Sequence, residues 1–312
     1  MISRWFFPVA TVGVIVAPLL GRWFGESFFL CELLSHFPVQ YAGVAGLLVA
    51  FWLGKSRCGM ASVALLGLLL NVSLCVGPFL ATPPPALNRP PDLRVFQANV
   101  LYTRTDYRPI IDTIRQLKPD FFVLQEMTPD GYRAMSALKN EYPYQDSIWA
   151  KGPCFIVVGS RTPFTTDSTA EQSHEVLLLT SMVRGQPMSL LSVHTRTPLL
   201  PSWFAQRNRQ LAFVASQLSR IERPAVLIGD FNTSIFSPVF KREFLDRQHT
   251  DLSIDACRTN FGWKPTWPTF LPLLYIPIDH AFVNTGYKTA NFRTLSTPGS
   301  DHRAICVDLI YR

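Results

Sequence analysis

Charged residues are scarce at the start of this 312-residue chain. Of the 29 lysines and arginines and 22 aspartates and glutamates, residues 1–81 hold only four and two. These are Arg4, Arg22, Glu26, Glu32, Lys55 and Arg57. Charged residues make up about a quarter of an ordinary soluble domain, so residues 1–81 have the composition of a membrane segment. Most of the net charge of +7 therefore belongs to the remainder, whose composition is that of a soluble domain.

Cysteine is also rare, and its spacing excludes a zinc-finger or disulfide framework. Three of the six cysteines lie in or beside the apolar runs and three are scattered beyond them: Cys31, Cys58 and Cys75, then Cys154, Cys257 and Cys306. At most one pair can bridge in the soluble part, and free buried thiols are the simpler expectation. There is also no dense run of Lys and Arg of the kind that follows a nucleic-acid backbone.

Three long apolar runs, residues 5–24, 34–53 and 60–80, predict three transmembrane helices, since a span needs about 20 mostly apolar residues. The positive-inside rule places Arg4 and the loop with Lys55 and Arg57 in the cytoplasm. An odd number of spans then puts the rest of the chain on the extracytoplasmic side, the periplasmic side of a bacterial inner membrane. A signal peptide in residues 1–24 is the alternative, but no small-x-small cleavage site follows and two more apolar runs do.

The composition predicts three parts: a membrane anchor (residues 1–81), a proline-rich linker (82–91) and one α/β domain (92–312). Strands are expected at residues 93–99, 121–125, 155–158, 176–183, 189–194, 225–229, 278–283 and 304–310. Several are apolar throughout, as strands buried on both faces are. Apolar residues at helical spacing predict helices around 110–117 and 211–218. Many strands with few helices favour two packed sheets with helices outside.

Polar side chains follow several of these strands. Asp230 and Asn232 lie in the Gly-Asp-Phe-Asn stretch that follows the apolar run 225–228. Asn99 and Glu126 close the first two predicted strands. Carboxylate and amide oxygens are ligands that Mg²⁺ prefers. The alternatives are an Asx-turn at Asp230, and a helix cap or solvated loop residue at Glu126.

Histidines occur at similar positions. His194 ends a strand, Asp279 and His280 begin another, and Asp301 and His302 precede the last. A carboxylate bonded to an imidazole fixes its tautomer and raises its basicity, so an Asp from one segment and a His from the other can form a catalytic couple. A lone strand-end histidine such as His194 is more often structural.

Taken in order, these motifs resemble those of the endonuclease/exonuclease/phosphatase superfamily, in a membrane-anchored bacterial form. The motifs are Asn99, Gln125-Glu126, His194, Gly229-Asp230-Phe231-Asn232, Ile278-Asp279-His280 and Ser300-Asp301-His302. Trp267-Pro268 also resembles a stretch of bacterial members. The resemblance covers residues 92–312 and implies a four-layer α/β/β/α sandwich with the site at one edge of the sheets.

The resemblance also implies roles for these residues. Asn99, Glu126 and Asp301 would hold or orient a metal, and Asp230 would align or deprotonate the attacking water. Asn232 and His194 would contact phosphate, and His302 supported by Asp279 would act as base or phosphate ligand. No separate task is evident for His280. Oxygen ligands favour Mg²⁺, with Mn²⁺ as a substitute, and the lack of a His/Cys cluster disfavours Zn²⁺.

The sequence thus predicts a membrane-anchored, metal-dependent phosphodiester hydrolase held in the bilayer by residues 5–80. A phosphomonoesterase acting on a lipid or sugar phosphate and a catalytically silent binding domain are the alternatives. Nucleic acid and phospholipid both remain open as the substrate. The segment 199–204 (LLPSWF) is apolar. It either forms part of the cleft rim, where it would stack a base or touch lipid, or packs against the core, which is the simpler expectation.

Overall fold

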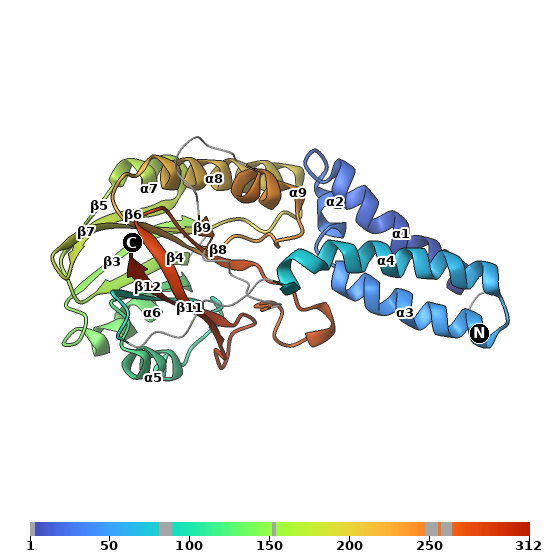
Figure 1. The fold of residues 1–312 in the computed structure, drawn as a ribbon. Coiled ribbons are helices and arrows are strands. Elements are labelled where there is room, and N and C mark those ends of the chain that lie inside the picture. Colours follow the sequence, from blue (N-terminus) through green and yellow to red (C-terminus); the bar gives the residue numbers. More distant parts are fainter. Residues whose placement is uncertain (1–3, 81–88, 152–153, 247–254, 257–263) are drawn as a thin grey trace.

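The computed structural model describes residues 4–80, 89–151, 154–246, 255–256 and 264–312. In the larger part, two six-stranded sheets pack face to face and carry helices on their outer faces (Figure 1). The predicted four-layer α/β/β/α sandwich is therefore confirmed. Most of the predicted linker and Cys257 lie outside the described residues. The described thiols that form no disulfide include Cys31, Cys58, Cys75 and Cys306.

The first sheet has the strand order β11-β12-β1-β2-β4-β3. Its strands are β1 (Leu93–Asn99), β2 (Phe121–Met127), β3 (Tyr144–Lys151), β4 (Cys154–Ser160), β11 (Tyr287–Leu295) and β12 (Ala304–Tyr311). Only β1 and β2 pair in parallel. The outer face is covered by α5 (Arg108–Leu117), α6 (Pro129–Ala134) and the short helix η1 (Met135–Leu138).

The second sheet has the order β5-β6-β7-β8-β10-β9. Its strands are β5 (Phe164–Thr166), β6 (Val176–Val183), β7 (Gln186–His194), β8 (Ala225–Asp230), β9 (Asp255–Ala256) and β10 (Asp279–Val283). Here β7 and β8 are the parallel pair. The outer helices are α7 (Ser168–His174), α8 (Pro201–Arg220) and α9 (Pro238–Phe240), and α9 continues into the helical turn Lys241–Leu245.

Along each central strand, side chains point alternately into the core between the sheets and into the core under the outer helices, as the pleat of a strand requires. Val95 in β1 and Ile228 in β8 face the core between the sheets, whereas Phe96 and Leu227 face the outer helices. At one end of β1, β2, β7, β8 and β10, the face that points between the sheets carries polar side chains instead of apolar ones. These are Gln97, Asn99, Gln125, His194, Asp230 and Asp279.

The topology brings these strand ends to one edge of the sandwich. The parallel pairs β1–β2 and β7–β8 end there, and the antiparallel β10 begins there, with Asp279 opposite Asp230. The turn before β12 lies at the same edge, because the Ser300 hydroxyl donates to Asn99 O over 2.7 Å. The fold alone therefore gathers residues from six segments of the chain.

The N-terminal part consists of α1 (Phe6–Phe24), α2 (Phe29–Leu34), α3 (Pro38–Gly54) and α4 (Cys58–Leu80). By length and composition α1 and α4 are able to cross a membrane, whereas α3 has 17 residues and is shorter than the other two. The predicted boundaries of the second span, 34–53, are wrong: Leu34 ends α2, and Pro38 starts α3 in the first helical turn, where proline is favoured.

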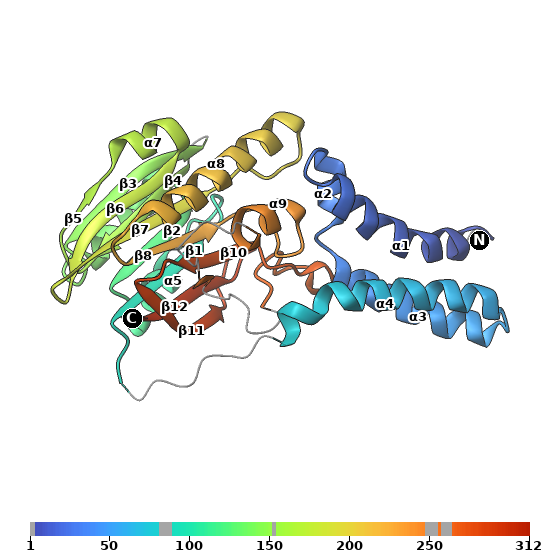
Figure 2. The same cartoon turned by 45° about the horizontal axis from the view of Figure 1, so that its top comes forward.

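These helices form a bundle that extends from one end of the sandwich. Trp52 Nε1 donates to Thr11 Oγ1 and Asn71 Nδ2 to Val14 O, both over 2.8 Å, so α3 and α4 are each tied to α1. The N-terminus and the turn between α3 and α4 lie far from the sheets (Figure 1). In contrast, α2 and the end of α4 lie beside the sandwich (Figure 2).

A buried ion pair joins α2 to the sandwich. Glu32 and Arg207 of α8 are both inaccessible to solvent, and Arg207 Nη1 lies 3.0 Å from Glu32 Oε1. The same nitrogen donates to Asn232 O over 3.0 Å. Two hydroxyls complete the shell of Glu32 Oε1, those of Thr233 (3.1 Å) and Ser237 (2.7 Å). The loop after β8 is thus held directly by the N-terminal helices.

The electrostatics of Glu32 follow from this shell. Burial favours the neutral acid, but His36 and Arg207 outweigh burial and lower the pKa of Glu32 to about 2. His36 Nε2 lies 3.3 Å from Glu32 Oε2, and its Nδ1 is 2.9 Å from Ser234 Oγ. Glu32 is therefore a buried carboxylate that depends on Arg207 and His36.

We expect Glu32→Ala to lower the free energy of unfolding by about 3–5 kcal/mol, because it leaves the Arg207 guanidinium buried without a counter-charge. Denaturation of the full chain in detergent measures this. The combined change Glu32→Leu with Arg207→Met should cost less than the sum of the two single changes. At the same junction, Glu26 pairs with Arg242 at 2.8 Å, with side chains 48% and 42% exposed. Glu26→Ala is the matched control, and an equal loss of stability for both glutamates would show that burial of the Glu32 pair is unimportant.

Gly229, directly before Asp230, leaves no space for a side chain. A Cβ there would overlap the carbonyl oxygen of Val193 in β7 and lie 2.8 Å from Gln125 Nε2. Because Val193 belongs to the paired strand, its carbonyl has no freedom to retreat. Gly229→Ala should therefore lower the free energy of unfolding by about 1–3 kcal/mol. Thermal unfolding tests this beside Gly59→Ala, whose Cβ would meet nothing within 4 Å.

Candidate active site

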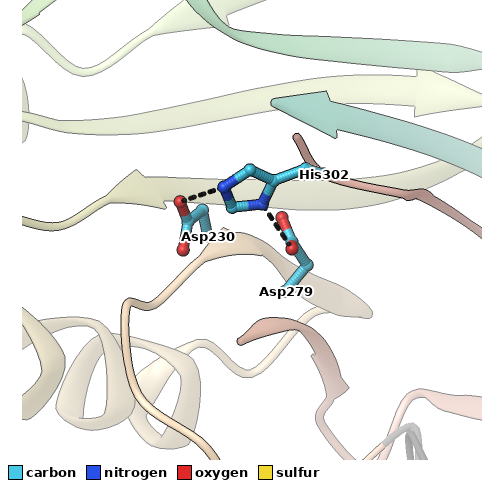
Figure 3. Close-up of side chains that lie close together, drawn as sticks. All are labelled: Asp230, Asp279 and His302. Atoms are coloured by element: carbon cyan, nitrogen blue, oxygen red, sulfur yellow. Dashed lines mark hydrogen bonds and ion pairs between the residues drawn. The ribbon is translucent and has the colours of Figure 1, made fainter. Parts of the chain in front are cut away.

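His302 lies between two aspartates at the polar edge (Figure 3). Its Nδ1 is 2.9 Å from Asp279 Oδ2, and its Nε2 is 3.8 Å from Asp230 Oδ2. All three side chains are buried. The structure therefore pairs Asp279 with His302, as the sequence predicted, and places Asp230 near the other ring nitrogen.

These carboxylates also set the charge of the imidazole. Burial opposes protonation of His302, but Asp279 and Asp230 outweigh burial and raise the pKa of His302 to about 10. A protonated His302 compensates part of the negative charge gathered at this edge. Asp279 holds Nδ1, so Nε2 is the nitrogen that faces Asp230.

Asn99, Glu126 and Asp230 form a second group, called here the acidic cluster. Asn99 Nδ2 donates to Glu126 Oε1 over 3.0 Å and to Asp230 Oδ2 over 3.2 Å. His194 Nε2 lies 3.4 Å from Glu126 Oε1 and 3.7 Å from Asp230 Oδ2. Among the described residues, neither ring nitrogen of this buried histidine makes a hydrogen bond. Two carboxylates thus converge on a single amide nitrogen.

The two carboxylates of the acidic cluster differ in their electrostatics. Burial raises the pKa of Glu126, but His194 and the donors Asn99 and Tyr102 N outweigh burial and lower it to about 2. Burial also raises the pKa of Asp230, and the negative charge of Asp279 adds to this, while His302 opposes it. Asp230 is therefore the carboxylate whose charge is less well compensated.

The backbone is strained at two site residues. Glu126 and Asn232 have φ angles of 58° and 46°, in the left-handed region that is unfavourable for residues other than glycine. The pairing of β2 with β4 also shifts between Leu124 and Met127, as at a β-bulge. Strict alternation would point Glu126 toward the outer helices, so the bulge and the positive φ turn its side chain to the edge.

Asn232 is held by Asp230, two residues before it. Its backbone N–H donates to Asp230 Oδ1 over 2.9 Å, which is the Asx-turn that the sequence left open. Its side-chain Nδ2 lies 2.9 Å from Thr195 O and 3.3 Å from Asp230 Oδ2. The Asx-turn therefore positions Asp230 and leaves Oδ2 with the acidic cluster.

Two glutamines connect the sheets beneath the site. Gln125 Nε2 crosses to Val193 O (2.7 Å), and its Oε1 accepts from Asp230 N (3.0 Å). Gln97 Nε2 donates to Gln125 Oε1 (2.9 Å) and Asp279 Oδ1 (3.2 Å). From the sequence alone, Gln125 received no role and Gln97 was missed. The sequence feature that could have identified both is a glutamine on the inward face of an otherwise apolar strand.

Asp301 occupies a different place from the acidic cluster. Its Oδ2 accepts from Trp267 Nε1 over 2.9 Å, and its Oδ1 is buried without a hydrogen-bond partner among the described residues. Its negative charge contributes to the raised pKa of His302. Trp267, noted in the sequence only for its resemblance to bacterial members, thus orients Asp301.

His280 has a structural position. Strand alternation places it on the helix side of β10, where its ring packs against Phe231 and Phe240. Its Nε2 is 2.8 Å from Thr233 O, and burial lowers its pKa to about 4. The neutral ring supports the loop after β8 from behind.

The donor chemistry of this edge fits a divalent cation. The acidic cluster offers the carboxylate oxygens of Glu126 and Asp230, which suit a hard ion such as Mg²⁺. Asn99 turns its Nδ2 toward them, and its Oδ1 accepts from Leu101 N over 3.1 Å. Asp230, Asp279 and His302 also have ligand atoms within 4.8 Å of one another. However, Asp279 Oδ2 already bonds to His302, so the acidic cluster is the better candidate.

Comparison with solved structures identifies the same fold. Danio rerio TDP2 complexed with single-strand DNA product shares 16% identity and a TM-score of 0.57, covering 70% of this chain and 98% of that one. An endonuclease/exonuclease/phosphatase from Beutenbergia cavernae gives 19% and 0.56, covering 70% and 71%. The Bacteroides vulgatus protein of that name gives 15% and 0.55, covering 70% and 99%. These identities show likeness of fold alone.

A search of curated proteins gives no significant match. A sequence model of the Endonuclease/Exonuclease/phosphatase family, in contrast, matches residues 96–302. This range begins in β1 and ends at His302, so it contains every residue assigned to the edge above. The chain therefore belongs to the Endonuclease/Exonuclease/phosphatase family.

Proposed function

We propose that this protein is a membrane-anchored, divalent-metal-dependent phosphodiester hydrolase. The observation that carries the proposal is the convergence of Glu126 and Asp230 on Asn99 Nδ2, beside the His302–Asp279 pair. Family membership supports hydrolysis of a phosphoester. The edge combines a candidate cation site with an acid–base pair, and both are needed when a phosphoester is attacked by water.

Glu126 and Asp230 would hold the cation, and Asn99 would orient their carboxylates through its Nδ2. Asp301 would hold or orient the cation. Mg²⁺ bound there, or Mn²⁺ in its place, would supply positive charge against the negative charge that develops on the phosphate oxygens and on the leaving alkoxide. His194, buried with its Nε2 beside Glu126 and Asp230, would contact a phosphate oxygen. Asn232, whose side-chain amide donates to Thr195 O and Asp230 Oδ2, would be the second residue to contact the phosphate.

Asp230 is placed to align the attacking water and to accept its proton, because Oδ2 faces the cluster while Oδ1 is fixed by Asn232 N. Asp279 fixes Nδ1 of His302, so Nε2 serves the reacting groups. Water attacks phosphorus directly in this scheme, and no covalent intermediate with a side chain is required.

The arrangement of the N-terminal helices supports an anchor of three spans with the sandwich outside the cytoplasm. Arg4, Lys55 and Arg57 belong to the end of the bundle that is remote from the sheets, and Arg22, Glu26 and Glu32 to the end beside them. Three of the four basic residues are thus at the remote end. The positive-inside rule makes the remote end cytoplasmic. In a bacterium the sandwich would face the periplasm.

We predict that Glu126→Gln and Asp230→Asn each reduce metal-dependent hydrolysis of bis(p-nitrophenyl) phosphate by at least about a hundredfold. Glu126→Gln should also weaken Mn²⁺ binding at least about tenfold in a calorimetric titration, since it removes a charged ligand. Glu141→Gln, which changes a 41% exposed carboxylate paired with Arg115, is the control. Full activity in either site variant would refute the proposal.

The orientation of the chain in the membrane is tested by reporter fusions. Alkaline phosphatase joined after Arg312 should be active, because the C-terminus is expected outside the cytoplasm, where this reporter folds. The same reporter inserted after Ser56, in the turn between α3 and α4, should be inactive. The reverse pattern would overturn the proposed sidedness.

A further inference from the structure

Large apolar side chains are exposed in the loop that precedes β10. Phe270 and Leu273 are 71% and 81% exposed, and Leu271 and Leu274 are also exposed. The loop includes the short helix η3 (Pro272–Leu274). So many adjacent exposed apolar side chains are unusual on a soluble surface and mark a contact site.

This loop connects the active site to the helical bundle. At its start, Thr269 N donates to Asp301 O over 2.8 Å, and the Thr269 hydroxyl donates to Ser300 O over 3.0 Å. At its end, Gln40 Nε2 of α3 donates to Tyr275 O over 2.9 Å. The exposed apolar residues therefore lie between the turn that carries His302 and the beginning of α3.

A second exposed apolar segment follows His194. Leu199, Leu200 and Trp203 are exposed at the start of α8, whereas Phe204 packs into the core. The sequence left this segment open between rim and core, and the structure divides it between the two. The start of α8 lies beside α2 (Figure 2). Residues 199–203 and 270–274 are called here the apolar rim.

We propose that the apolar rim rests in the surface of the bilayer that holds α1 and α4, and that the site hydrolyses the phosphodiester of a membrane phospholipid. This inference rests on the proposed function. Apolar side chains at the ends of membrane helices gain free energy by entering the acyl boundary. The apolar rim would then bring lipid headgroups to the acidic cluster while the acyl chains stay in the bilayer.

The chemistry is a balanced hydrolysis. The oxygen of water forms a bond to phosphorus, the bond from phosphorus to one alcohol oxygen breaks, and a proton from water ends on that alcohol. One phospholipid and one water give a phosphomonoester and an alcohol. Nucleic acid is the less suitable substrate, since its backbone is held by Lys and Arg side chains, whereas the rim is made of Leu, Phe and Trp.

Bilayer contact is tested without any measurement of activity. Leu273→Trp is introduced into the full chain, which is placed in nanodiscs of ordinary or bromine-labelled phosphatidylglycerol and phosphatidylethanolamine. We expect the added tryptophan to increase the fraction of emission quenched by bromine. Met182→Trp, at a 53% exposed position in the hairpin of β6 and β7, is the control and should add no quenching. Equal quenching in the two variants would overturn the proposed contact.

The substrate class is tested with the double change Phe270→Ser and Leu273→Ser. Hydrolysis of the phospholipids in these nanodiscs should fall at least about tenfold, because lost apolar contact weakens headgroup capture. Turnover of soluble bis(p-nitrophenyl) phosphate should stay within about twofold, and Met182→Ser should change neither rate.

Three other results of this experiment would each contradict a different proposal. Cleavage of single-stranded DNA in preference to phospholipid by the unaltered chain would overturn the substrate class. Equal loss of phospholipid and soluble turnover would overturn the role of the rim. Failure of the unaltered chain to hydrolyse any phosphodiester would refute the proposed function itself, and the quenching result would still decide the bilayer contact.

Discussion

The negative charge buried at one edge of the two sheets is the constraint on which the rest of the structure depends. Glu126 and Asp230 share the donor Asn99 Nδ2, and Asp279 lies close to Asp230. Removing a carboxylate from water costs several kcal/mol unless charges or donors compensate it. The protonated His302 supplies part of that compensation, and the excess of carboxylates is what a divalent cation would neutralise.

The fold keeps these acids together by rigid means. The two parallel strand pairs end at the same edge. Gln97 and Gln125 bond across the gap between the sheets, to Asp279 and Val193 respectively. The loop after β8 is further held from outside by the Glu32–Arg207 pair. The N-terminal helices are therefore part of the support of the site, in addition to any role as an anchor.

The sequence predicted the interior of the fold better than its borders. All eight predicted strands occur, and the four that it missed, β3, β5, β9 and β11, are the edge strands of the two sheets. An interior strand packed on both faces is apolar throughout, whereas an edge strand such as β11 alternates with exposed Lys288 and Asn291. The apolar pattern is therefore weakest at the edges.

The candidate site was likewise predicted in part from the sequence. Strand ends and the family motifs indicated Asn99, Asp230 and the His302–Asp279 pair, because strand topology brings them to one edge. The bulge that turns Glu126 and the contact of Asp301 with Trp267 arise from tertiary packing, which periodicity does not encode. Glu32 was noted only as a loop charge, since its partner Arg207 lies far away in the sequence.

The most direct test of a cation site at this edge is an anomalous-scattering map of crystals of the full chain soaked in Mn²⁺. We expect a peak at the acidic cluster, within coordination distance of Glu126 and Asp230 oxygens. A map at saturating Mn²⁺ with no peak at this edge, or with its only peak elsewhere, would contradict the assignment of Glu126 and Asp230 as metal ligands.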